Sequence, residues 1–426
     1  MKVKGISLGC KVNTYEMEFI LSSFKDKGYE ITDDIADIYV VNTCSVTNMS
    51  DAKSRKVINR VVRENPKAIV VVMGCMIEAN KDYSNDGVSI IIGNKDKKRV
   101  AELVEEYIKK NEKIKRLYPD FDNEFEDMFI TNMEGRTRAF VKIQDGCENF
   151  CSYCIIPYTR GKCRSKKKEI VLEEINTLVN NGYKEVVLTG IHTGHYGEDG
   201  ETSFPELLRE IVKIDGLKRL RISSIEITEL NDDFLDVLKK YPVIVDHMHI
   251  PLQAGSDKVL KEMNRKYDTK YFLNKINIIR SIRPNISITT DIIVGFPGET
   301  DEEFNETCEF SKKVGFSKIH VFPYSRRSGT KADTMPNQID EQTKKERVAK
   351  LMQVSDELEK KYLDKFVNQE VEVLVEKSID GISIGHTGNY LQVEISKVCD
   401  KNSLINVIIK ERSEKKLIGE VNEKNK

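Results

Sequence analysis

Three cysteines close together in the sequence constrain this chain more than any other feature. Cys147, Cys151 and Cys154 form a C-x3-C-x2-C array directly after the predicted strand Ala139–Gln144. A four-iron cluster normally takes four thiolate ligands, whereas this array supplies three and would leave one iron open to a small molecule. The array therefore predicts an iron–sulfur cluster with one open coordination site.

A structural zinc site is the alternative for the same cysteines. Zinc in such sites takes four ligands, usually from two paired clips, and Cys163 is the candidate for the fourth. Its spacing from the array matches no such clip. The ligand count therefore favours a cluster over zinc.

The array and its flanks resemble the signature of radical S-adenosylmethionine (SAM) enzymes. The segment RTRAFVKIQDGCENFCSYCIIPYTRG, residues 136–161, is similar to the methylthiotransferase branch, which puts a methylthio group on a tRNA adenosine or on a ribosomal protein. In that superfamily the open iron binds SAM, and the reduced cluster splits it into methionine and a 5′-deoxyadenosyl radical. The resemblance implies SAM as a cofactor and Cys147, Cys151 and Cys154 as catalytic cluster ligands.

Composition sets broad limits on domain number and compartment. A chain of 426 residues with nine cysteines suggests two or three domains and no secreted disulfide framework. The 68 Lys and Arg residues are balanced by 69 Asp and Glu residues, so RNA binding would need local basic patches. The longest apolar run, Ala68–Ile77, is far shorter than the ~20 residues that span a bilayer. We expect a cytoplasmic protein without a membrane partner.

The first domain, residues 1–118, alternates predicted strands and helices. The strands are Val3–Leu8, Ile38–Asn42, Ala68–Met73 and Val88–Ile92, with helices near residues 14–27, 47–64 and 96–110. This rhythm predicts an α/β domain with a doubly wound parallel sheet. No G-x-G-x-x-G follows the first strand, which disfavours a dinucleotide-binding fold.

A second group of cysteines follows the strands of this domain. Cys10, Cys44 and Cys75 each lie one or two residues beyond a predicted strand end. The ends of parallel strands meet at one edge of a sheet, where such folds bind ligands. Each cysteine alone could be a small buried side chain, but three at equivalent positions favour a second cluster.

The segments around these cysteines extend the family resemblance. LGCKVNTYE, VVNTCSVTNMSDAKSR and VVMGCM are similar to the N-terminal domain of the methylthiotransferases. There, three such cysteines hold an auxiliary four-iron cluster that carries the sulfur to be donated. The resemblance implies two four-iron clusters in this chain, with Cys10, Cys44 and Cys75 as ligands of the second.

Residues 138–365, which follow a predicted linker at residues 119–137, again alternate strands and helices, with more residues between successive strands. The strands are Ala139–Gln144, Glu185–Thr189, Arg219–Ser223, Val245–Ile250, Ser287–Val294 and Lys318–Pro323. Six β/α units predict an incomplete TIM-like barrel, open on one side, with its chemistry at the C-terminal strand ends. The cysteine array follows the first of these strands, as that rule requires.

Other strand ends of the barrel carry glycine-rich or polar segments. Taken with the cysteine array, these segments resemble those that hold SAM in the family, which implies Gly190, Ser223, Gln253 and Gly295 as cofactor-binding residues. Without the array they would be ordinary βα loops.

Several other residues invite a functional interpretation that the sequence does not support. His192 and His195 lie in a loop expected to be solvated, and we interpret them as incidental. The same holds for three cysteines outside the two groups, Cys163, Cys308 and Cys399. The basic run 160–168 is typical of a solvated face, although its nearness to the array makes contact with phosphates an equal alternative.

The last domain, residues 366–426, changes to period-two alternation. Five short strands in about fifty residues suggest a small antiparallel β-barrel of OB type, a frequent nucleic-acid platform. It resembles the TRAM domain, which binds tRNA in related modifying enzymes, and this implies tRNA as a partner. A purely structural cap is the alternative.

The resemblance is strongest to the branch acting on N6-threonylcarbamoyladenosine at tRNA position 37. LGCKVN with Lys11 and FPYSRRSGT with Arg326 and Arg327 carry it, and these cations could pair with the carboxylate of that base. We expect 2-methylthiolation of this base with electrons from a flavodoxin- or ferredoxin-like donor. The alternatives are the isopentenyladenosine branch, the ribosomal-protein aspartate branch, and a non-catalytic cysteine-rich RNA-binding or redox-sensing protein.

Overall fold

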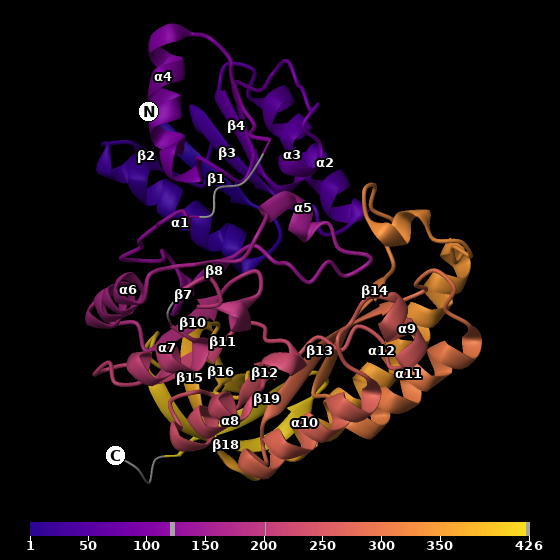
Figure 1. The fold of residues 1–426 in the computed structure, drawn as a ribbon. Helices are drawn as coiled ribbons and strands as arrows, with labels where there is room; N and C mark the ends of the chain where they lie inside the picture. The colour runs from indigo at the N-terminus through magenta and orange to yellow at the C-terminus, as the bar shows by residue number, and fades with distance from the viewer. Residues whose placement is uncertain (120–123, 201, 423–426) are drawn as a thin grey trace.

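The computed structural model describes residues 1–119, 124–200 and 202–422. The chain forms three parts: an N-terminal sheet domain, a central β/α barrel and a small C-terminal barrel (Figure 1). The N-terminal domain lies over one end of the central barrel, and the C-terminal barrel lies at the other end. The predicted α/β class is confirmed.

The N-terminal domain is a six-stranded parallel sheet in the order β2-β1-β3-β4-β5-β6. Its strands are β1 (Lys2–Ser7), β2 (Glu30–Ile31), β3 (Ile38–Thr43), β4 (Ile69–Gly74), β5 (Ile90–Ile92) and β6 (Ile114–Arg116). Its helices are α1 (Lys11–Asp26), α2 (Asn48–Glu64), α3 (Cys75–Ala79), η1 (Lys97–Arg99) and α4 (Val100–Lys110). Separate apolar cores cover the two faces of the sheet, so the predicted double winding is confirmed. The short edge strands β2 and β6 were not predicted.

The central domain carries six strands in two parallel three-stranded sheets, β11-β10-β7 and β12-β13-β14. The strands are β7 (Arg138–Lys142), β10 (Glu185–Thr189), β11 (Arg219–Ile222), β12 (His247–His249), β13 (Ser287–Val294) and β14 (Lys318–Pro323). Helices α6 (Lys168–Asn180), α7 (Phe204–Ile211), α8 (Asp232–Lys240), α9 (Asp257–Glu262), α10 (Thr269–Ile282) and α11 (Asp301–Val314) lie between them. A bridge between Leu220 and Ile244 joins the two sheets, while β7 and β14 do not pair in the described structure. The predicted incomplete barrel is confirmed.

The described part of the predicted linker packs against both neighbouring domains. Residues 120–123 of the linker lie outside the described residues. Met128, Ile130 and Met133 are buried in the main core, and the Tyr15 hydroxyl on α1 lies 2.6 Å from the Met128 carbonyl oxygen, to which it donates. The described part of this segment is therefore packed against both domains that it connects.

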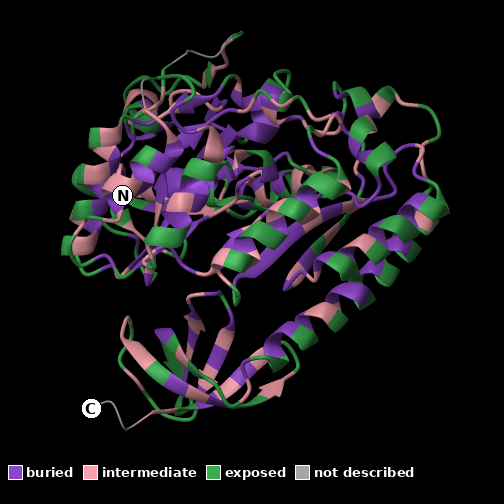
Figure 2. Ribbon diagram, turned by 60° about the horizontal axis from the view of Figure 1, so that its bottom comes forward, coloured by how far each residue is buried: buried purple, intermediate pink, exposed green. Residues whose placement is uncertain are grey.

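Helix α12 (Glu341–Asp364) leads from the central barrel to the C-terminal barrel (Figure 2). That barrel closes in the order β15-β16-β17-β19-β18, with strands β15 (Glu370–Ile379), β16 (Ile382–Thr387), β17 (Gln392–Ile395), β18 (Leu404–Ser413) and β19 (Lys416–Val421). The predicted small barrel is confirmed, but β17 and β19 pair in parallel, so the expectation of a wholly antiparallel sheet is wrong. The strand β18 runs antiparallel to β15, and β19 runs antiparallel to β18. The strand β19 therefore points in the same direction as β17, with which it pairs.

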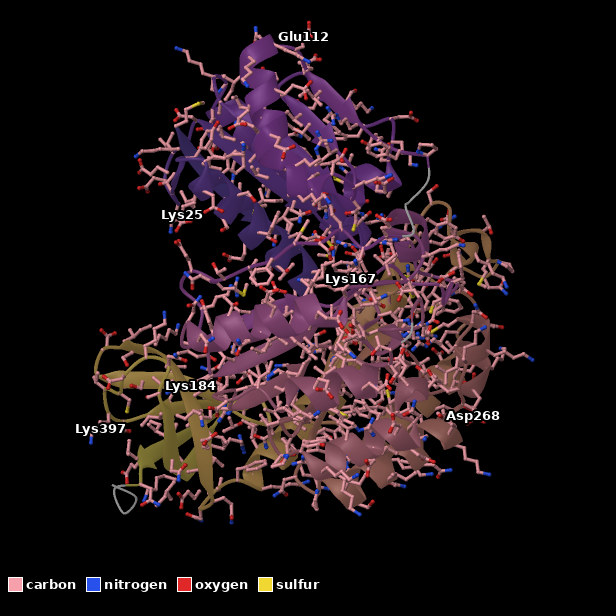
Figure 3. The ribbon with its side chains drawn as sticks, turned by 60° about the vertical axis from the view of Figure 1, so that its left-hand side comes forward. Lys25, Glu112, Lys167, Lys184, Asp268 and Lys397 are labelled. Atoms are coloured by element: carbon pink, nitrogen blue, oxygen red, sulfur yellow. The ribbon has the colours of Figure 1, made fainter. Side chains whose placement is uncertain are left out.

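Charged side chains are spread over all three parts of the molecule. Figure 3 shows Lys25 and Glu112 on the N-terminal domain, Lys184 on the central barrel and Lys397 at the edge of the C-terminal barrel. Within the described residues, we find no helix with the length and apolar character needed to cross a membrane.

Candidate functional site

The compact cysteine array lies in a loop fixed by backbone hydrogen bonds. The loop runs from β8 (Gln144–Asp145) to α5 (Ile156–Arg160). Gly146 at its start has a φ of 78°, and a Cβ there would lie 1.8 Å from the Lys162 carbonyl oxygen, so only glycine fits. Ser152 donates to the Glu262 carbonyl from 2.6 Å, and Asn264 donates to two loop carbonyls, those of Asn149 and Phe150. The barrel thus holds the loop in place from the α9–α10 side.

The thiols of this loop are desolvated and have polar neighbours. Burial raises the pKa of Cys154 to about 12 and raises that of Cys147 further. The Arg265 guanidinium lies 3.4 Å from the Cys151 sulfur, and His192 Nδ1 lies 3.7 Å from the Cys147 sulfur. Because metal binding requires thiolates, these thiols would release protons on binding a metal cluster.

The second cysteine group lies at the C-terminal edge of three neighbouring strands. Cys10, Cys44 and Cys75 follow β1, β3 and β4, which are adjacent in the sheet. Helix α1 begins three residues earlier than predicted, so Cys10 is its N-cap residue. Gly9, with a φ of 94°, allows close packing, since a Cβ there would lie 2.6 Å from the Cys44 sulfur. The topology brings together three thiols separated by 34 and 31 residues in the sequence.

Polar side chains join this second group to the compact array. Asn94 donates to the Cys75 sulfur over 3.4 Å and to the Thr159 carbonyl, in α5, over 2.7 Å. Burial, with smaller contributions from the neighbouring Cys75 and Cys10 thiols, raises the pKa of Cys44 to about 11. The two cysteine groups therefore share α5 as a common boundary.

Both cysteine groups are too open for a single metal ion. All six cysteines are free thiols, and a tetrahedral zinc ion with Zn–S bonds of ~2.3 Å would hold its sulfur atoms about 3.8 Å apart. Among the residues that the structure describes, neither group has all three sulfur atoms within 4.8 Å of one another. A four-iron cube is larger and takes thiolates at separate corners. Three free thiols in each group could therefore serve three corners of such a cluster.

A buried ionic network lies between the two groups. Glu16 of α1 contacts Lys97, Lys142 and Arg160, and Arg160 also donates to Asp145 over 3.0 Å. Burial opposes ionisation of Glu16, but the three cations outweigh it and hold its pKa well below the ordinary value. The network joins the helix that follows Cys10 to the loop that carries Cys147.

The prediction that the basic run 160–168 is a solvated face is wrong. Arg160, Arg164 and Lys166 are buried, and Lys166 lies within an ion pair with Glu174 on α6. Within the run, only Lys162 and Lys167 are exposed. The sequence shows a nearly continuous run of charge, whereas the fold directs half of its six basic side chains toward buried carboxylates.

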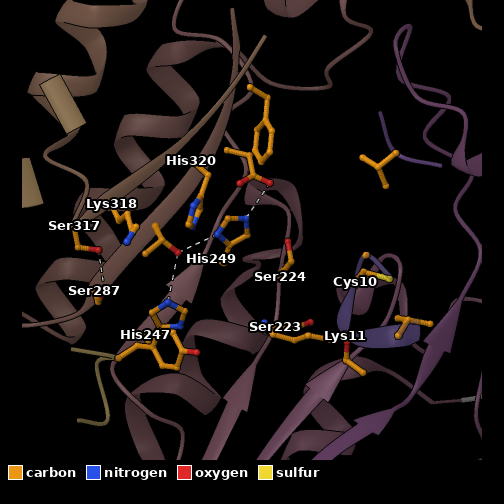
Figure 4. A pocket seen from close by; sticks show the side chains of 18 of the residues that line it. Cys10, Lys11, Ser223, Ser224, His247, His249, Ser287, Ser317, Lys318 and His320 are labelled. Atoms are coloured by element: carbon orange, nitrogen blue, oxygen red, sulfur yellow. Dashed lines mark hydrogen bonds and ion pairs between the residues drawn. The ribbon is translucent and has the colours of Figure 1, made fainter. Parts of the chain in front are cut away.

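One cavity of about 780 Å³ connects the second cysteine group to the interior of the barrel. It is lined by Cys10, Cys44, Cys75, Arg160, Gly190 and Ser223, among others. Figure 4 shows Cys10 and Lys11 on one wall, histidines of the barrel strands on the opposite wall, and Ser223 and Ser224 between them. Burial, with Arg221 and Arg138 nearby, lowers the pKa of Lys11. The cavity therefore places the predicted sulfur-carrying site beside the barrel strands.

The residues predicted to bind SAM or the substrate do not all lie at the cavity. Gly190, Ser223 and Lys11 line the cavity, whereas its lining does not include Gln253 or Gly295. Gln253 forms a backbone bridge with Ile292 and has a φ of 68°. Gly295 has a φ of 71°, and its N–H donates to Glu299. Both lie in βα turns outside the cavity lining.

Arg326 and Arg327 also lie outside the cavity lining. Arg326 pairs with Asp333 at the surface. Arg327 is buried and donates to Asp51 over 2.7 Å and to the Ser45 hydroxyl, which follows Cys44 directly. In the structure, Arg327 fastens the Cys44 segment to the barrel.

The expectation that the His192–His195 loop is solvated is wrong. His192 is buried, and its ring stacks on His195 with 3.5 Å between centroids. Burial lowers the pKa of both imidazoles to about 4, and burial raises the pKa of the adjacent Glu229 to about 7. Cys163 is buried beside them, 3.8 Å from His195 Nδ1. Cys308 is buried in α11, and Cys399 lies between β17 and β18.

Sequence reasoning missed Arg265 and the histidines of the barrel wall. Arg265 forms an ion pair with Glu226 beside Cys151. His247, His249 and His320 line the cavity. The strand segments HMH and KIHVFP carry alternating polar residues, a signal that the inward face of these strands is polar.

The chain is similar to known proteins over most of its length. Residues 141–311 match the Radical SAM superfamily, and residues 2–93 match the Uncharacterized protein family UPF0004. The threonylcarbamoyladenosine tRNA methylthiotransferase MtaB of Bacillus subtilis (strain 168) is 43% identical, over 91% of this chain and 88% of that protein. The tRNA-2-methylthio-N(6)-dimethylallyladenosine synthase of Acetivibrio thermocellus is 35% identical, over 89% and 82%.

A solved structure supports the fold. The radical S-adenosylmethionine methyltransferase TsrM from Kitasatospora setae, with cobalamin and a 4Fe-4S cluster bound, superposes with a TM-score of 0.59. It covers 78% of this chain and 76% of its own, at 14% sequence identity. At this sequence identity the likeness concerns the fold alone.

Proposed function

The chain belongs to the radical SAM methylthiotransferase family, and from that premise we propose that it methylthiolates carbon 2 of N6-threonylcarbamoyladenosine at position 37 of tRNA. It is a transferase whose cofactors are SAM and two four-iron clusters. The observation that carries the proposal is the cavity in which Cys10, Cys44 and Cys75 face the interior of the barrel.

The reaction needs chemistry that side chains alone cannot supply. A ring C–H of adenine has no leaving group and no useful acidity, so general acid–base catalysis cannot replace it with sulfur. Bound SAM and the two clusters supply the carbon radical and the sulfur. The chain's own task is to hold these groups and the base in one enclosed space.

Each of the two cysteine groups binds one cluster in this proposal. In this proposal Cys147, Cys151 and Cys154 hold the cluster that binds SAM, and Cys10, Cys44 and Cys75 hold the auxiliary cluster. Gly190 and Ser223, just past the ends of β10 and β11, line the cavity and would border the bound SAM. Gln253 and Gly295 contribute through the shape of their βα turns.

The cavity has the size and edges that a modified nucleobase requires. Its volume of about 780 Å³ is within the usual range for pockets that bury a small molecule. Phe322 and Tyr390 line it and are exposed, so an everted base can stack on an aromatic ring as it enters. Tyr390 belongs to the C-terminal barrel, so in this proposal that barrel also borders the entering base.

Of the three cations predicted to pair with the base, Lys11 is the one we assign to the substrate. It lines the cavity next to Cys10, whereas Arg326 and Arg327 pair with Asp333 and Asp51 outside it. A carboxylate on the base would find in Lys11 a partly desolvated cation.

An electron donor of flavodoxin or ferredoxin type completes the proposal. Phe150, inside the compact array, and Tyr158 of α5 are both exposed and pack edge to face with centroids 5.8 Å apart. They mark the side on which the array approaches the surface. A small redox protein that docks there would transfer its electron over the shortest path to the cluster.

Nucleoside analysis of a deletion strain tests the function. Total tRNA from the deletion strain should lack 2-methylthio-N6-threonylcarbamoyladenosine and retain the unthiolated base, and the wild-type gene should restore the product. Loss of a 2-methylthio dimethylallyl product would assign the chain to the other tRNA branch. Unchanged nucleosides would reject tRNA methylthiolation.

Iron counting separates the enzyme from a non-catalytic binding protein. Anaerobically reconstituted protein should contain about eight irons per chain, as two four-iron clusters require. One zinc and no iron would reject the enzyme and support a cysteine-rich binding module.

A further inference from the structure

The inward face of β12, β13 and β14 is polar where such barrels usually pack aliphatic side chains. Three histidines, a threonine, an aspartate and a lysine line the cavity from these strands: His247, His249, Thr289, Asp291, Lys318 and His320. The strand register pairs His249 with Thr289 and Asp291 with His320, so these residues lie side by side. Lys11 on the facing wall and His320 are both exposed to this cavity, so their nitrogen donors are accessible to a polar ligand.

One half of this wall is held rigid by hydrogen bonds. His249 Nδ1 lies 2.9 Å from the Thr289 hydroxyl, and its Nε2 lies 3.3 Å from an Asp291 oxygen (Figure 4). The Thr289 hydroxyl also lies 3.4 Å from His247 Nε2. His249 is therefore fixed between two partners, and within the described residues the Asp291 carboxylate makes no other side-chain hydrogen bond or ion pair.

Two nitrogen donors in the cavity have no such partner. Within the described residues, neither His320 nor Lys11 makes a side-chain hydrogen bond or ion pair, although both line the cavity. Lys318, by contrast, lies 3.4 Å from Glu359. His320 and Lys11 lie on opposite walls (Figure 4), so a ligand between them would meet a donor on each side.

We propose that His320 and Lys11 bind the carboxylate of the N6 substituent of the substrate base, while Asp291, oriented by His249, accepts from its hydroxyl or N–H groups. This inference rests on the proposed function and names the residues that distinguish the carboxylate-bearing base from an apolar one. A histidine, a lysine and one free carboxylate oxygen match a group that carries both an anion and donors. An isopentenyl group would offer no partner to His320 or Lys11, and Asp291 would keep only its contact with His249.

Binding of three anticodon stem-loops to the reconstituted holoenzyme tests the proposal. The stem-loops carry at position 37 N6-threonylcarbamoyladenosine, its methyl ester or unmodified adenosine. Wild-type protein should prefer the free acid over the ester by about 10- to 100-fold, the range of a charge-assisted hydrogen bond. His320→Phe and Lys11→Met should each reduce this preference to within about threefold.

The controls separate recognition from folding and from cluster loss. Lys331→Gln, exposed on η4 (Lys331–Thr334) outside the cavity lining, should retain the full preference. Iron content and melting temperature should match wild type in all variants. A wild-type preference that persists in both cavity variants would overturn the inference but leave the function intact.

Two other outcomes are equally decisive. Equal binding of all three stem-loops by wild type, with no methylthiolation of the acid, would reject the proposed substrate itself. His249, Asp291 and His320 are also close enough to hold one divalent ion. If EDTA removed the preference for the acid and Mn²⁺ or Zn²⁺ restored it, an ion would bind the carboxylate and direct pairing would be wrong.

Discussion

The two cysteine groups solve the same chemical task with opposite architectures. Cys147, Cys151 and Cys154 lie within eight residues of one loop, whereas Cys10 and Cys75 are 65 residues apart and meet only through the sheet. The loop is held by hydrogen bonds to one segment of its own barrel, while the sheet group depends on neighbouring strands and on contacts with the barrel. A local site tolerates loosening of the domains, and a topological site does not.

The first prediction removes each group in turn and has the largest effect. Replacing Cys147, Cys151 and Cys154 together by alanine should abolish both methylthiolation and SAM cleavage. Replacing Cys10, Cys44 and Cys75 should abolish methylthiolation but preserve formation of 5′-deoxyadenosine. Each triple variant should retain about four irons per chain.

Iron analysis and chromatographic detection of 5′-deoxyadenosine make this measurement. Replacing Cys308, which is buried in α11 away from both groups, by alanine is the control and should retain about eight irons. If the sheet-group variant also failed to cleave SAM, the two groups would not be separable, and the division of tasks would be wrong.

The second prediction concerns the buried ionic network between the two cysteine groups. Glu16→Gln should destabilise the folded protein by about 3–5 kcal/mol, because Lys97, Lys142 and Arg160 would remain buried without their shared carboxylate. Chemical denaturation of the cluster-free protein measures this free energy of unfolding.

Glu18→Gln on the same helix is the matched control. Glu18 is partly exposed and lies 3.9 Å from Arg136, so its loss should cost less than about 1 kcal/mol. Comparable losses in the two variants would show that the buried network contributes no more than a surface pair.

Much of this architecture follows from local sequence patterns. The compact array is recognisable from spacing alone, and the sheet group from the rule that parallel strand ends share an edge. The capping box at Thr300 and Glu303 also forms as the sequence indicates. In these cases a short segment, or one simple topological rule, determines the geometry.

Long-range pairings could not be predicted in this way. Arg327 donates to Ser45, which is 282 residues distant, and Arg160 to Glu16, which is 144 residues distant. Both arginines belong to segments that look like solvent-exposed charge. Their partners become apparent only when the N-terminal domain is placed over the barrel. The sequence alone therefore does not reveal whether a charged side chain lies at the surface or in a buried contact between domains.

The third prediction concerns that placement. Because Arg327 fastens the Cys44 segment to the barrel, Arg327→Ala should lower turnover on threonylcarbamoyl- and dimethylallyl-bearing stem-loops by the same factor. We expect a loss of about 10- to 100-fold, corresponding to the ~1.5–3 kcal/mol of hydrogen bonds to a charged group. Single-turnover assays on both RNAs measure it.

Arg63→Ala, exposed at the far end of α2, should leave both rates unchanged. A selective loss on the threonylcarbamoyl RNA would instead mean that Arg327 leaves Asp51 to bind the substrate. That result would restore the pairing expected from the sequence and weaken the assignment to Lys11.

The last prediction compares the thiols of the two groups in cluster-free protein. With pKa values of about 12 for Cys154 and about 11 for Cys44, the thiolate fraction of Cys154 should be about tenfold smaller at any pH well below both. Iodoacetamide reacts with thiolates, so Cys154 should be alkylated more slowly than Cys44, and both rates should rise about tenfold per pH unit between pH 7 and 10. Accessibility alone would give the reverse order, because Cys44 is 6% exposed and Cys154 is only half-buried. Mass spectrometry with Cys399 as the rate reference therefore decides whether desolvation of the charge or access of the reagent governs the two groups.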